Sequence, residues 1–289
     1  LKMSLQFPQK SKLGDIRDIQ SLRDTITGDV LVHLAAVHTD DIADKYEYQR
    51  TNIEGTSNIT QVCSELKIKK IIFTSTVAVY GFANPGTDEK GKINPFNEYG
   101  QTKFDAEQKL RAWQPEGQNS LIIVRPTVIF GEGNRGNVYN LFRHISSGKF
   151  IMIGKGENKK SMAYVENVGS FLECCINSNQ KNGLYNYVDT PDLKMKDLVA
   201  FVRFKLKGQK RVGLTLPYFV GLFLGYLADL AAKITRKNFP ISSIRVKKFV
   251  SPTEFRSSQS KLDKFLAPYS LKQGIERTLH SEFLSSNSN

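Results

Sequence analysis

The sequence has few of the residues that build disulfide frameworks or zinc sites. Its 289 residues include three cysteines, Cys63, Cys174 and Cys175, which form no CxxC pair, and four histidines. Such a chain suits a reducing compartment, and we expect no metal site. Residues 1–14 also lack the apolar core and cleavage site of a secretory signal, so the sequence predicts a cytoplasmic protein.

Acidic residues are scarce in one part of the chain. The formal net charge is +13, and residues 201–260 carry twelve lysines and arginines against only Asp229 and Glu254. This cluster predicts a partner such as a phosphate group, nucleic acid or an anionic membrane, with a solvated surface as the simpler alternative. The aromatic residues of the segment recur at core-like spacing and no nucleic-acid motif accompanies them, so we do not expect nucleic acid as a partner.

Short β-rich runs alternate with longer segments of helical periodicity, which predicts an α/β fold with a doubly wound parallel sheet. The expected strands are Val30–Leu34, Lys70–Thr74 and Leu121–Val124. These runs are continuously apolar or β-branched, as is typical of strands that are covered on both faces. The expected helices are Tyr46–Leu66 and Glu98–Trp113.

Glycine is missing where a dinucleotide-binding fold needs it. Such a fold begins with a strand, a glycine-rich turn and a helix. The glycines before residue 60 are Gly14, Gly28 and Gly55, and they form neither GxGxxG nor GxxGxxG. After Gly131 the pattern changes to short mixed elements. This change places the domain boundary near residue 130. We expect an incomplete dinucleotide-binding domain in residues 1–130 and a smaller α/β substrate domain in residues 131–289, with some later segments returning to the first domain.

Thr76, Tyr99 and Lys103 form the sharpest local signal. Thr76 follows a predicted strand at its carboxyl end, where open α/β sheets bind ligands. Tyr99 and Lys103 are four residues apart, so a helix places phenol and ammonium on one face. A nearby cation favours the phenolate, which can then act as a general base while the threonine hydroxyl bonds the substrate oxygen. YxxxK alone arises by chance in many chains, so the context has to support it.

Six motifs in register supply that context. In chain order they are Gly14-Asp15-Ile16-Arg17-Asp18, His33-Leu34-Ala35-Ala36, Asn52-Ile53-Glu54-Gly55-Thr56, Ser75-Thr76-Val77-Ala78-Val79-Tyr80-Gly81, Tyr99-Gly100-Gln101-Thr102-Lys103 and Arg125-Pro126-Thr127. Their order and spacing resemble the extended short-chain dehydrogenase/reductase family, which includes nucleotide-sugar epimerases and dehydratases. The resemblance implies a Rossmann-like fold and NAD as the cofactor.

The resemblance also implies roles for individual residues. Those near the adenine and along the cofactor would be Asp15, Ile16, Leu34, Ala35, Ala36 and Asn52. Those at the nicotinamide and its ribose would be Tyr99, Lys103, Pro126 and Thr127. For the leucine and alanines, plain packing at a strand end explains the pattern equally well.

The family's first strand, its glycine-rich phosphate loop and the acidic residue that selects NAD over NADP have no counterpart here. Judged from the usual length of a βαβ unit, about 45 residues are expected upstream of Leu1, which indicates an N-terminally truncated copy. Without the loop the pyrophosphate loses its main anion site. A non-catalytic binding protein is therefore an alternative to an enzyme.

The residues after Thr76 favour epimerisation over dehydration. Dehydratases of the family typically place an acid and a base there, whereas this chain has Val77 and Ala78, which move no proton. Segments 125–141, 159–165 and 242–249 resemble bacterial O-antigen enzymes that epimerise polyprenyl-diphosphate N-acetylhexosamines at C4. Candidates for binding the sugar and diphosphate, besides Thr76, are Arg135, Asn137, Lys159 and Lys160.

A soluble UDP-sugar 4-epimerase remains the alternative, although such enzymes tend to carry an asparagine where this chain has Val128. The resemblance also implies a homodimer through the two predicted helices. Residues 212–228 are uncharged, apolar at helical spacing and flanked by basic residues. They are shorter than the roughly 20 residues of a spanning helix. They predict either a core helix of the substrate domain or an interfacial helix that holds the protein at the inner face of the cell membrane.

Overall fold

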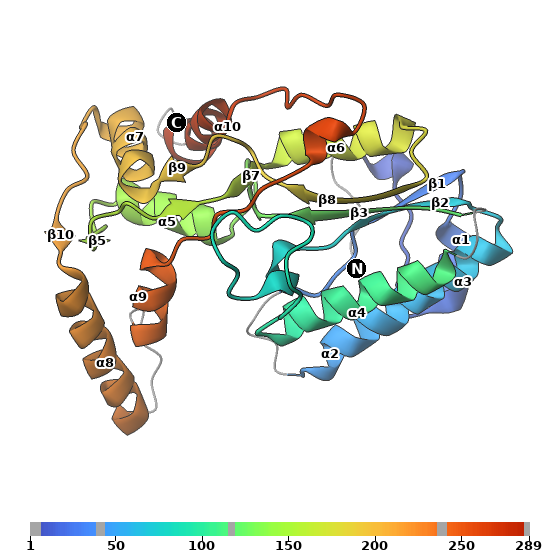
Figure 1. Ribbon diagram of the computed structural model, residues 1–289, viewed down its shortest axis with the longest axis horizontal. Helices are drawn as coiled ribbons and strands as arrows, with labels where there is room; N and C mark the ends of the chain where they lie inside the picture. The colour runs from blue at the N-terminus through green and yellow to red at the C-terminus, as the bar shows by residue number, and fades with distance from the viewer. Residues whose placement is uncertain (1–6, 39–43, 115–118, 236–241, 286–289) are drawn as a thin grey trace.

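A four-stranded parallel sheet forms the larger part of the molecule (Figure 1). The computed structural model describes residues 7–38, 44–114, 119–235 and 242–285. The strands lie in the order β1-β2-β3-β8, with bounds β1 Val30–His33, β2 Lys70–Thr74, β3 Ser120–Pro126 and β8 Asn182–Tyr187. The predicted strands are confirmed, with β3 somewhat longer and β1 one residue shorter than expected.

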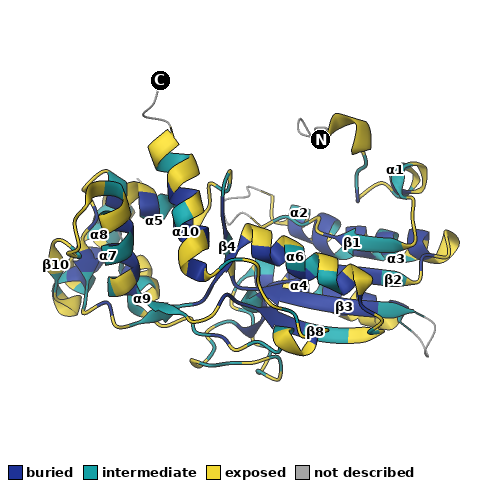
Figure 2. Cartoon of the chain, turned by 90° about the horizontal axis from the view of Figure 1, so that it is seen from above, coloured by how far each residue is buried: buried dark blue, intermediate teal, exposed yellow. Residues whose placement is uncertain are grey.

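Helices cover both faces of the sheet, because alternate residues of each strand point to opposite sides. Ile71 and Phe73 of β2 pack with α3 (Gly55–Glu65) and α4 (Glu98–Trp113). Ile72, between them, packs with α6 (Val165–Asn177). Figure 1 shows α3 and α4 below the sheet and α6 above it, and Figure 2 shows β3 buried along most of its length. The doubly wound α/β arrangement is therefore confirmed.

The first two helices of the chain pack against α3 and α4. α1 (Ile19–Thr25) is capped by the Asp18 carboxylate, which accepts hydrogen bonds from the backbone amides of Gln20 and Ser21. The predicted helix 46–66 consists of α2 (Tyr46–Tyr48), a π-helical segment (Gln49–Glu54) and α3. The predicted helix 98–113 is α4, with the bounds expected.

A second hydrophobic cluster lies beside the sheet. It is built from α5 (Asn137–Ser146), α7 (Met195–Lys207), α10 (Leu271–Leu279) and short strands. β4 (Val128–Phe130) pairs with β7 (Met162–Tyr164), β5 (Met152–Ile153) with β10 (Thr215–Leu216), and β6 (Lys159–Lys160) with β9 (Leu193–Lys194). Short 3-10 or π-helical segments span Pro8–Lys10, Val77–Tyr80, Gln259–Lys261 and His280–Leu284. Although α6 and β8 follow residue 131, they lie with the main sheet.

α8 (Tyr218–Thr235) and α9 (Ser243–Val250) project from this second part (Figure 1). α8 contacts the protein through small and polar residues. A methyl group added at Gly221 would lie 2.6 Å from Ile153 Cγ2, one added at Gly225 would lie 2.8 Å from Ser243 Cα, and Asp229 accepts a hydrogen bond from the Ser243 amide. Only 11% of α8 is buried, so the interpretation of residues 212–228 as a core helix is wrong.

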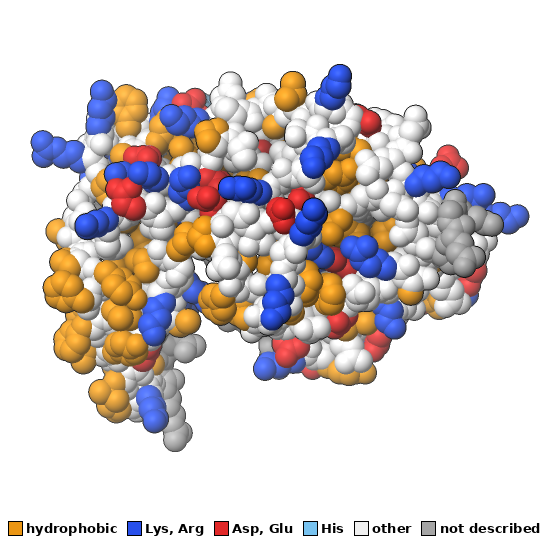
Figure 3. Space-filling view, viewed as in Figure 1, with side chains coloured by type: hydrophobic (Ala, Val, Ile, Leu, Met, Phe, Trp, Pro, Cys, Tyr) orange, Lys and Arg blue, Asp and Glu red, His pale blue; other side chains and the backbone are white. Residues whose placement is uncertain are grey.

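By length and composition, α8 is the one helix in the described residues that could cross a membrane. Ten large apolar side chains in and beside it are exposed. Figure 3 shows hydrophobic side chains gathered over α8 on the face in view. The ten exposed residues are Leu214, Tyr218, Phe219, Phe223, Leu224, Tyr226, Leu227, Leu230, Ile234 and Ile244. We call these ten residues the apolar hairpin face.

Candidate functional site

The end of β2 and the start of α4 bring Thr76 and Tyr99 together. Thr76 caps the short helix Val77–Tyr80 by accepting a hydrogen bond from the Ala78 amide at 3.1 Å. Asn97 caps α4 by accepting one from the Gly100 amide at 3.0 Å. The two segments touch, since a Cβ at Gly100 would lie 2.6 Å from the Ala78 carbonyl oxygen, and only glycine allows this approach.

Tyr99 is half-buried and hydrogen-bonded to the Thr76 hydroxyl. Burial raises the pKa of Tyr99, and the Thr76 hydrogen bond lowers it by a smaller amount. The sequence argument expected Lys103 to favour the phenolate. The net direction in the structure is the opposite, because the loss of water around the phenol outweighs the stabilisation of its charged form.

Lys103 is 2% exposed, and its Nζ lies 4.0 Å from the centre of the Phe73 ring. Burial lowers the pKa of Lys103 to about 7, and the negative charge of Glu107 opposes that shift. Near neutral pH the Lys103 amine is therefore close to the midpoint of its titration, where a bound charged group can change its protonation.

Behind Lys103 lies a buried polar network that the sequence reasoning did not find. Glu107 accepts hydrogen bonds from Arg125 Nε at 2.8 Å, from Arg125 Nη2 at 2.5 Å and from Ser75 Oγ at 2.6 Å. Arg125 Nη1 also donates to the Tyr80 hydroxyl, which donates to Asn186. The signals for it were an acid one turn after Lys103 and an arginine before Pro126, but neither reveals the pairing.

Two adjoining cavities follow the carboxyl edge of the sheet. The first, of about 880 Å³, includes Asp15, Ile16, Leu34, Ala35 and Ala36 in its lining. The second, of about 620 Å³, includes Thr76, Tyr99, Lys103, Pro126, Thr127 and Asn137. Leu34 and Ala36 line both, so the cavities meet at this segment.

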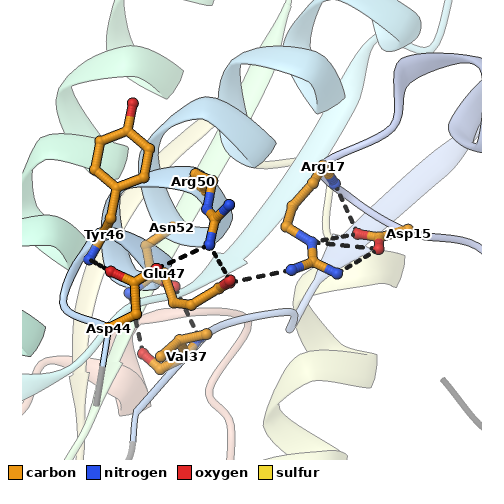
Figure 4. Close-up of polar contacts among 8 residues, drawn as sticks. All are labelled: Asp15, Arg17, Val37, Asp44, Tyr46, Glu47, Arg50 and Asn52. Carbon is orange, nitrogen blue, oxygen red and sulfur yellow. Dashed lines mark hydrogen bonds and ion pairs between the residues drawn. The ribbon is translucent and has the colours of Figure 1, made fainter. Parts of the chain in front are cut away.

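Asn52 supports that segment rather than lining either cavity (Figure 4). Its side chain is buried, accepts a hydrogen bond from the Val37 amide at 2.8 Å and donates to the Val37 carbonyl at 3.0 Å. Asp15 lies at the right of Figure 4 and forms an ion pair with Arg17 at 2.7 Å. Hydrogen bonds from Arg17 hold the pKa of Asp15 at about 2, so this carboxylate stays charged.

The cavities suit a cofactor that carries hydrogen-bonding groups. The hydroxyls of Thr74 and Thr127 are buried at the second cavity, and neither has a hydrogen-bond partner within the described residues. Buried hydroxyls are rarely left unpaired. Their donors and acceptors, with Lys103 beside them, fit the ribose and carboxamide of a nicotinamide.

Three of the four other substrate-binding candidates have partners elsewhere. Arg135 pairs with Glu282 at 3.0 Å, and Lys159 pairs with Glu254 at 3.3 Å. Lys160 donates to the carbonyls of Lys248 and Ser251 at the end of α9, and burial lowers its pKa to about 8. Asn137, at the start of α5, lines the second cavity.

No group of three or more metal-binding side chains occurs in the part of the chain that the structure describes. The three cysteines are free, and burial raises the pKa of each thiol. Thiolate chemistry at the cavities is therefore not indicated.

Comparison with known proteins gives a consistent result. A model of the NAD dependent epimerase/dehydratase family matches residues 5–187. The N-acetyl-α-D-glucosaminyl-diphospho-ditrans,octacis-undecaprenol 4-epimerase of Escherichia coli O157:H7 is 46% identical over 96% of this chain and 85% of that protein.

Solved structures show the same fold. The UDP-glucuronic acid 4-epimerase of Bacillus cereus with NAD has a TM-score of 0.70 at 20% identity, over 92% of this chain and 78% of that one. The UDP-glucose 4-epimerase of Thermotoga maritima has a TM-score of 0.71 at 17% identity, over 94% of this chain and 83% of that one.

Proposed function

Because the chain belongs to the NAD-dependent epimerase/dehydratase family, we propose that it inverts C4 of an N-acetylhexosamine carried on a polyprenyl diphosphate, for O-antigen or a related surface polysaccharide. The observation that carries this proposal is the 46% identity, over 96% of the chain, to the Escherichia coli lipid-linked epimerase. The second candidate is a soluble UDP-sugar 4-epimerase.

The chain's own residues handle the proton of the sugar hydroxyl. NAD, held by the residues that line the two cavities, would supply the hydride acceptor and donor that inversion at C4 requires. Tyr99 takes the proton from O4 in its phenolate form, which burial disfavours and a charged Lys103 would favour, and it gives the proton back as the phenol. The Thr76 hydroxyl, which bonds Tyr99, orients the oxygen. Lys103 bonds the ribose and supplies positive charge beneath the base. The remaining cofactor contacts are assigned to Asp15, Ile16, Leu34, Ala35, Ala36, Pro126 and Thr127, with Asn52 holding the segment that separates the cavities.

The diphosphate is assigned to the start of α5. Gly136 and Asn137 line the second cavity, and the amides at a helix N-terminus favour an anion. Arg135, Lys159 and Lys160 are held in other contacts, which makes them weaker candidates than Asn137.

The direct test is a comparison of two substrates that share the sugar. Enzyme supplied with NAD should convert polyprenyl-diphosphate N-acetylglucosamine and leave UDP-N-acetylglucosamine unchanged, with a Tyr99→Phe variant as the inactive control. Comparable efficiency on both would favour the soluble epimerase. Conversion of neither, by a folded protein that binds NAD, would favour a non-catalytic binding protein.

Membrane attachment belongs to the same proposal. The apolar hairpin face is flanked by exposed cations, which are Lys210, Arg211, Lys233, Arg245, Lys247 and Lys248. Each cation near an anionic leaflet contributes about 1 kcal/mol. We therefore place the protein in the cytoplasm, at the inner face of the cell membrane.

Salt separates the two contributions to this attachment. Raising ionic strength from about 0.1 M to 1 M shortens the screening length from about 10 Å to 3 Å, which should release part of the protein from anionic vesicles. Phe219→Ser with Phe223→Ser should make the rest salt-sensitive without unfolding the protein, since these side chains are 73% and 61% exposed. A wild-type protein that never sediments with anionic vesicles would disprove attachment.

A homodimer through α2–α3 and α4 completes the proposal, as the family resemblance implies. Light scattering on the purified protein measures its mass directly, and a monomer across the micromolar range would contradict this assignment.

A further inference from the structure

Two exposed phenylalanines stack at the mouth of the second cavity. Phe82 and Phe96 have ring centres 4.7 Å apart and are 69% and 47% exposed. Phe96 also lines the cavity that contains Thr76 and Tyr99. A molecule that reaches from the cavity past Phe96 therefore meets this pair, which we call the aromatic shelf.

The backbone fixes the shelf in place. The Asn94 amide donates to the Val79 carbonyl at 3.0 Å, which holds the segment before Phe96 against the segment before Phe82. Gly81 has a φ of 64°, and a Cβ there would lie 1.9 Å from the Asn94 carbonyl oxygen. Only glycine fits at this position, so the backbone holds the two segments close together. The two rings therefore stay side by side although both are exposed to water.

A cation links the shelf to the apolar hairpin face. Lys248 Nζ lies 4.9 Å from the centre of the Phe96 ring and makes no ion pair within the described residues. Lys248 belongs to α9, which packs against α8. A cation and two exposed rings thus stand side by side at the edge of the second cavity, and the cation belongs to the helix that packs against α8.

We propose that the aromatic shelf binds the first isoprene units of a polyprenyl diphosphate substrate, whose diphosphate lies between the start of α5 and Lys248. This inference rests on the proposed function, because it assumes a lipid-linked sugar in the cavity. The chemistry agrees at each position: the sugar lies at Tyr99, the charged diphosphate meets the cation, and the flat unsaturated chain lies on the rings.

The test uses wild type and variants in detergent micelles, which removes any effect of vesicle binding. The probes are N-acetylglucosamine diphosphate esters of a long polyprenol and of methanol. Phe82→Ala with Phe96→Ala should raise KM for the polyprenyl ester roughly tenfold or more, because each ring loses an apolar contact. KM for the methyl ester, which does not reach Phe82, should rise much less than KM for the polyprenyl ester.

A matched control is Phe204→Ala. Phe204 is 42% exposed and has Lys210 Nζ 5.5 Å from its ring centre, but it does not line the second cavity. Its replacement should change KM for neither ester. Because both esters carry the diphosphate, Lys248→Gln should raise KM for both of them, whereas Lys210→Gln should raise KM for neither.

The outcomes separate this inference from the proposed function. If wild type ignores the polyprenyl ester and converts the UDP sugar, the proposed function fails. If wild type converts the polyprenyl ester and the double variant has the same KM, or raises KM equally for both esters, the shelf assignment fails. A polyprenyl diphosphate with a benzophenone in its second isoprene gives a readout that needs no variant: crosslinks at residues 82 and 96 support the shelf, and crosslinks only elsewhere overturn it.

Discussion

Replacing Glu107 by leucine should destabilise the protein strongly, because it breaks a fully buried ion pair. Glu107 is 0% exposed and Arg125 is 2% exposed, and two hydrogen bonds of 2.8 and 2.5 Å join them. Glu107→Leu leaves the guanidinium in the interior without a counter-charge, and breaking such pairs costs about 3–5 kcal/mol. The Ser75 hydroxyl also loses its acceptor, at a further cost of about 1 kcal/mol.

The assay is urea unfolding followed by circular dichroism, compared with two other variants. Glu107→Leu with Arg125→Met removes both charges and should recover a large part of the loss, since a buried pair replaced by apolar residues of similar volume is often neutral. Glu65→Ala breaks a pair with Arg23 whose side chains are 38% and 37% exposed, and should shift the midpoint far less.

A loss below about 1 kcal/mol for Glu107→Leu would refute this reasoning, and so would a double variant no more stable than the single one. Natural domains are stable by only about 5–15 kcal/mol, so the expected loss is a large fraction of the total. It therefore lies well within the range of the measurement.

Three further outcomes follow from the site. Tyr99→Phe should lower kcat by roughly 10³-fold or more with an unchanged melting temperature, and a variant that keeps a tenth of the rate would show that another residue is the base. Lys103→Met should abolish turnover yet raise the melting temperature, because it removes a buried cation whose pKa is about 7. That gain should be full below pH 7 and shrink toward pH 10, where the wild-type lysine is neutral in the folded protein, so a gain that grows with pH would contradict it. Asn52→Ala, which frees the backbone of Val37, should cost about 1–3 kcal/mol of stability and weaken NAD binding measured by calorimetry, and unchanged binding would separate Asn52 from the cofactor site.

The strands and α4 were predictable because each has a strong local cause. β2 is a short β-branched and apolar run, and α4 begins where Asn97 caps it. The π-helical segment Gln49–Glu54 was not predictable, since hydrophobic spacing over one turn cannot distinguish it from an α-helix. Its position depends on packing against α4, which is a tertiary contact.

The site was predictable where the chain order of the motifs fixes the geometry, and not where a distant partner decides. Thr76 and Tyr99 meet because both lie at one edge of the sheet. Lys159 and Arg135 are basic residues in loops or short strands, and nothing local reveals that Glu254 and Glu282 pair with them. The pKa direction of Tyr99 was missed for the same reason, since burial is a property of the whole fold.

The orientation of α8 is the feature that hydropathy could not supply. Its large apolar residues recur at helical spacing, which suits a core helix and a membrane-surface helix equally well. In the structure Gly221, Gly225 and Asp229 face the protein, while the apolar hairpin face is exposed. Each large apolar side chain of the apolar hairpin face lacks the stabilisation of about 1.5–3 kcal/mol that full burial would provide. Exposure to water gives these side chains no such gain, whereas the membrane surface of the proposed attachment would cover them. The outward-facing helix and the proposed lipid-linked substrate therefore support each other, and the substrate rests in addition on the 46% identity to the Escherichia coli epimerase.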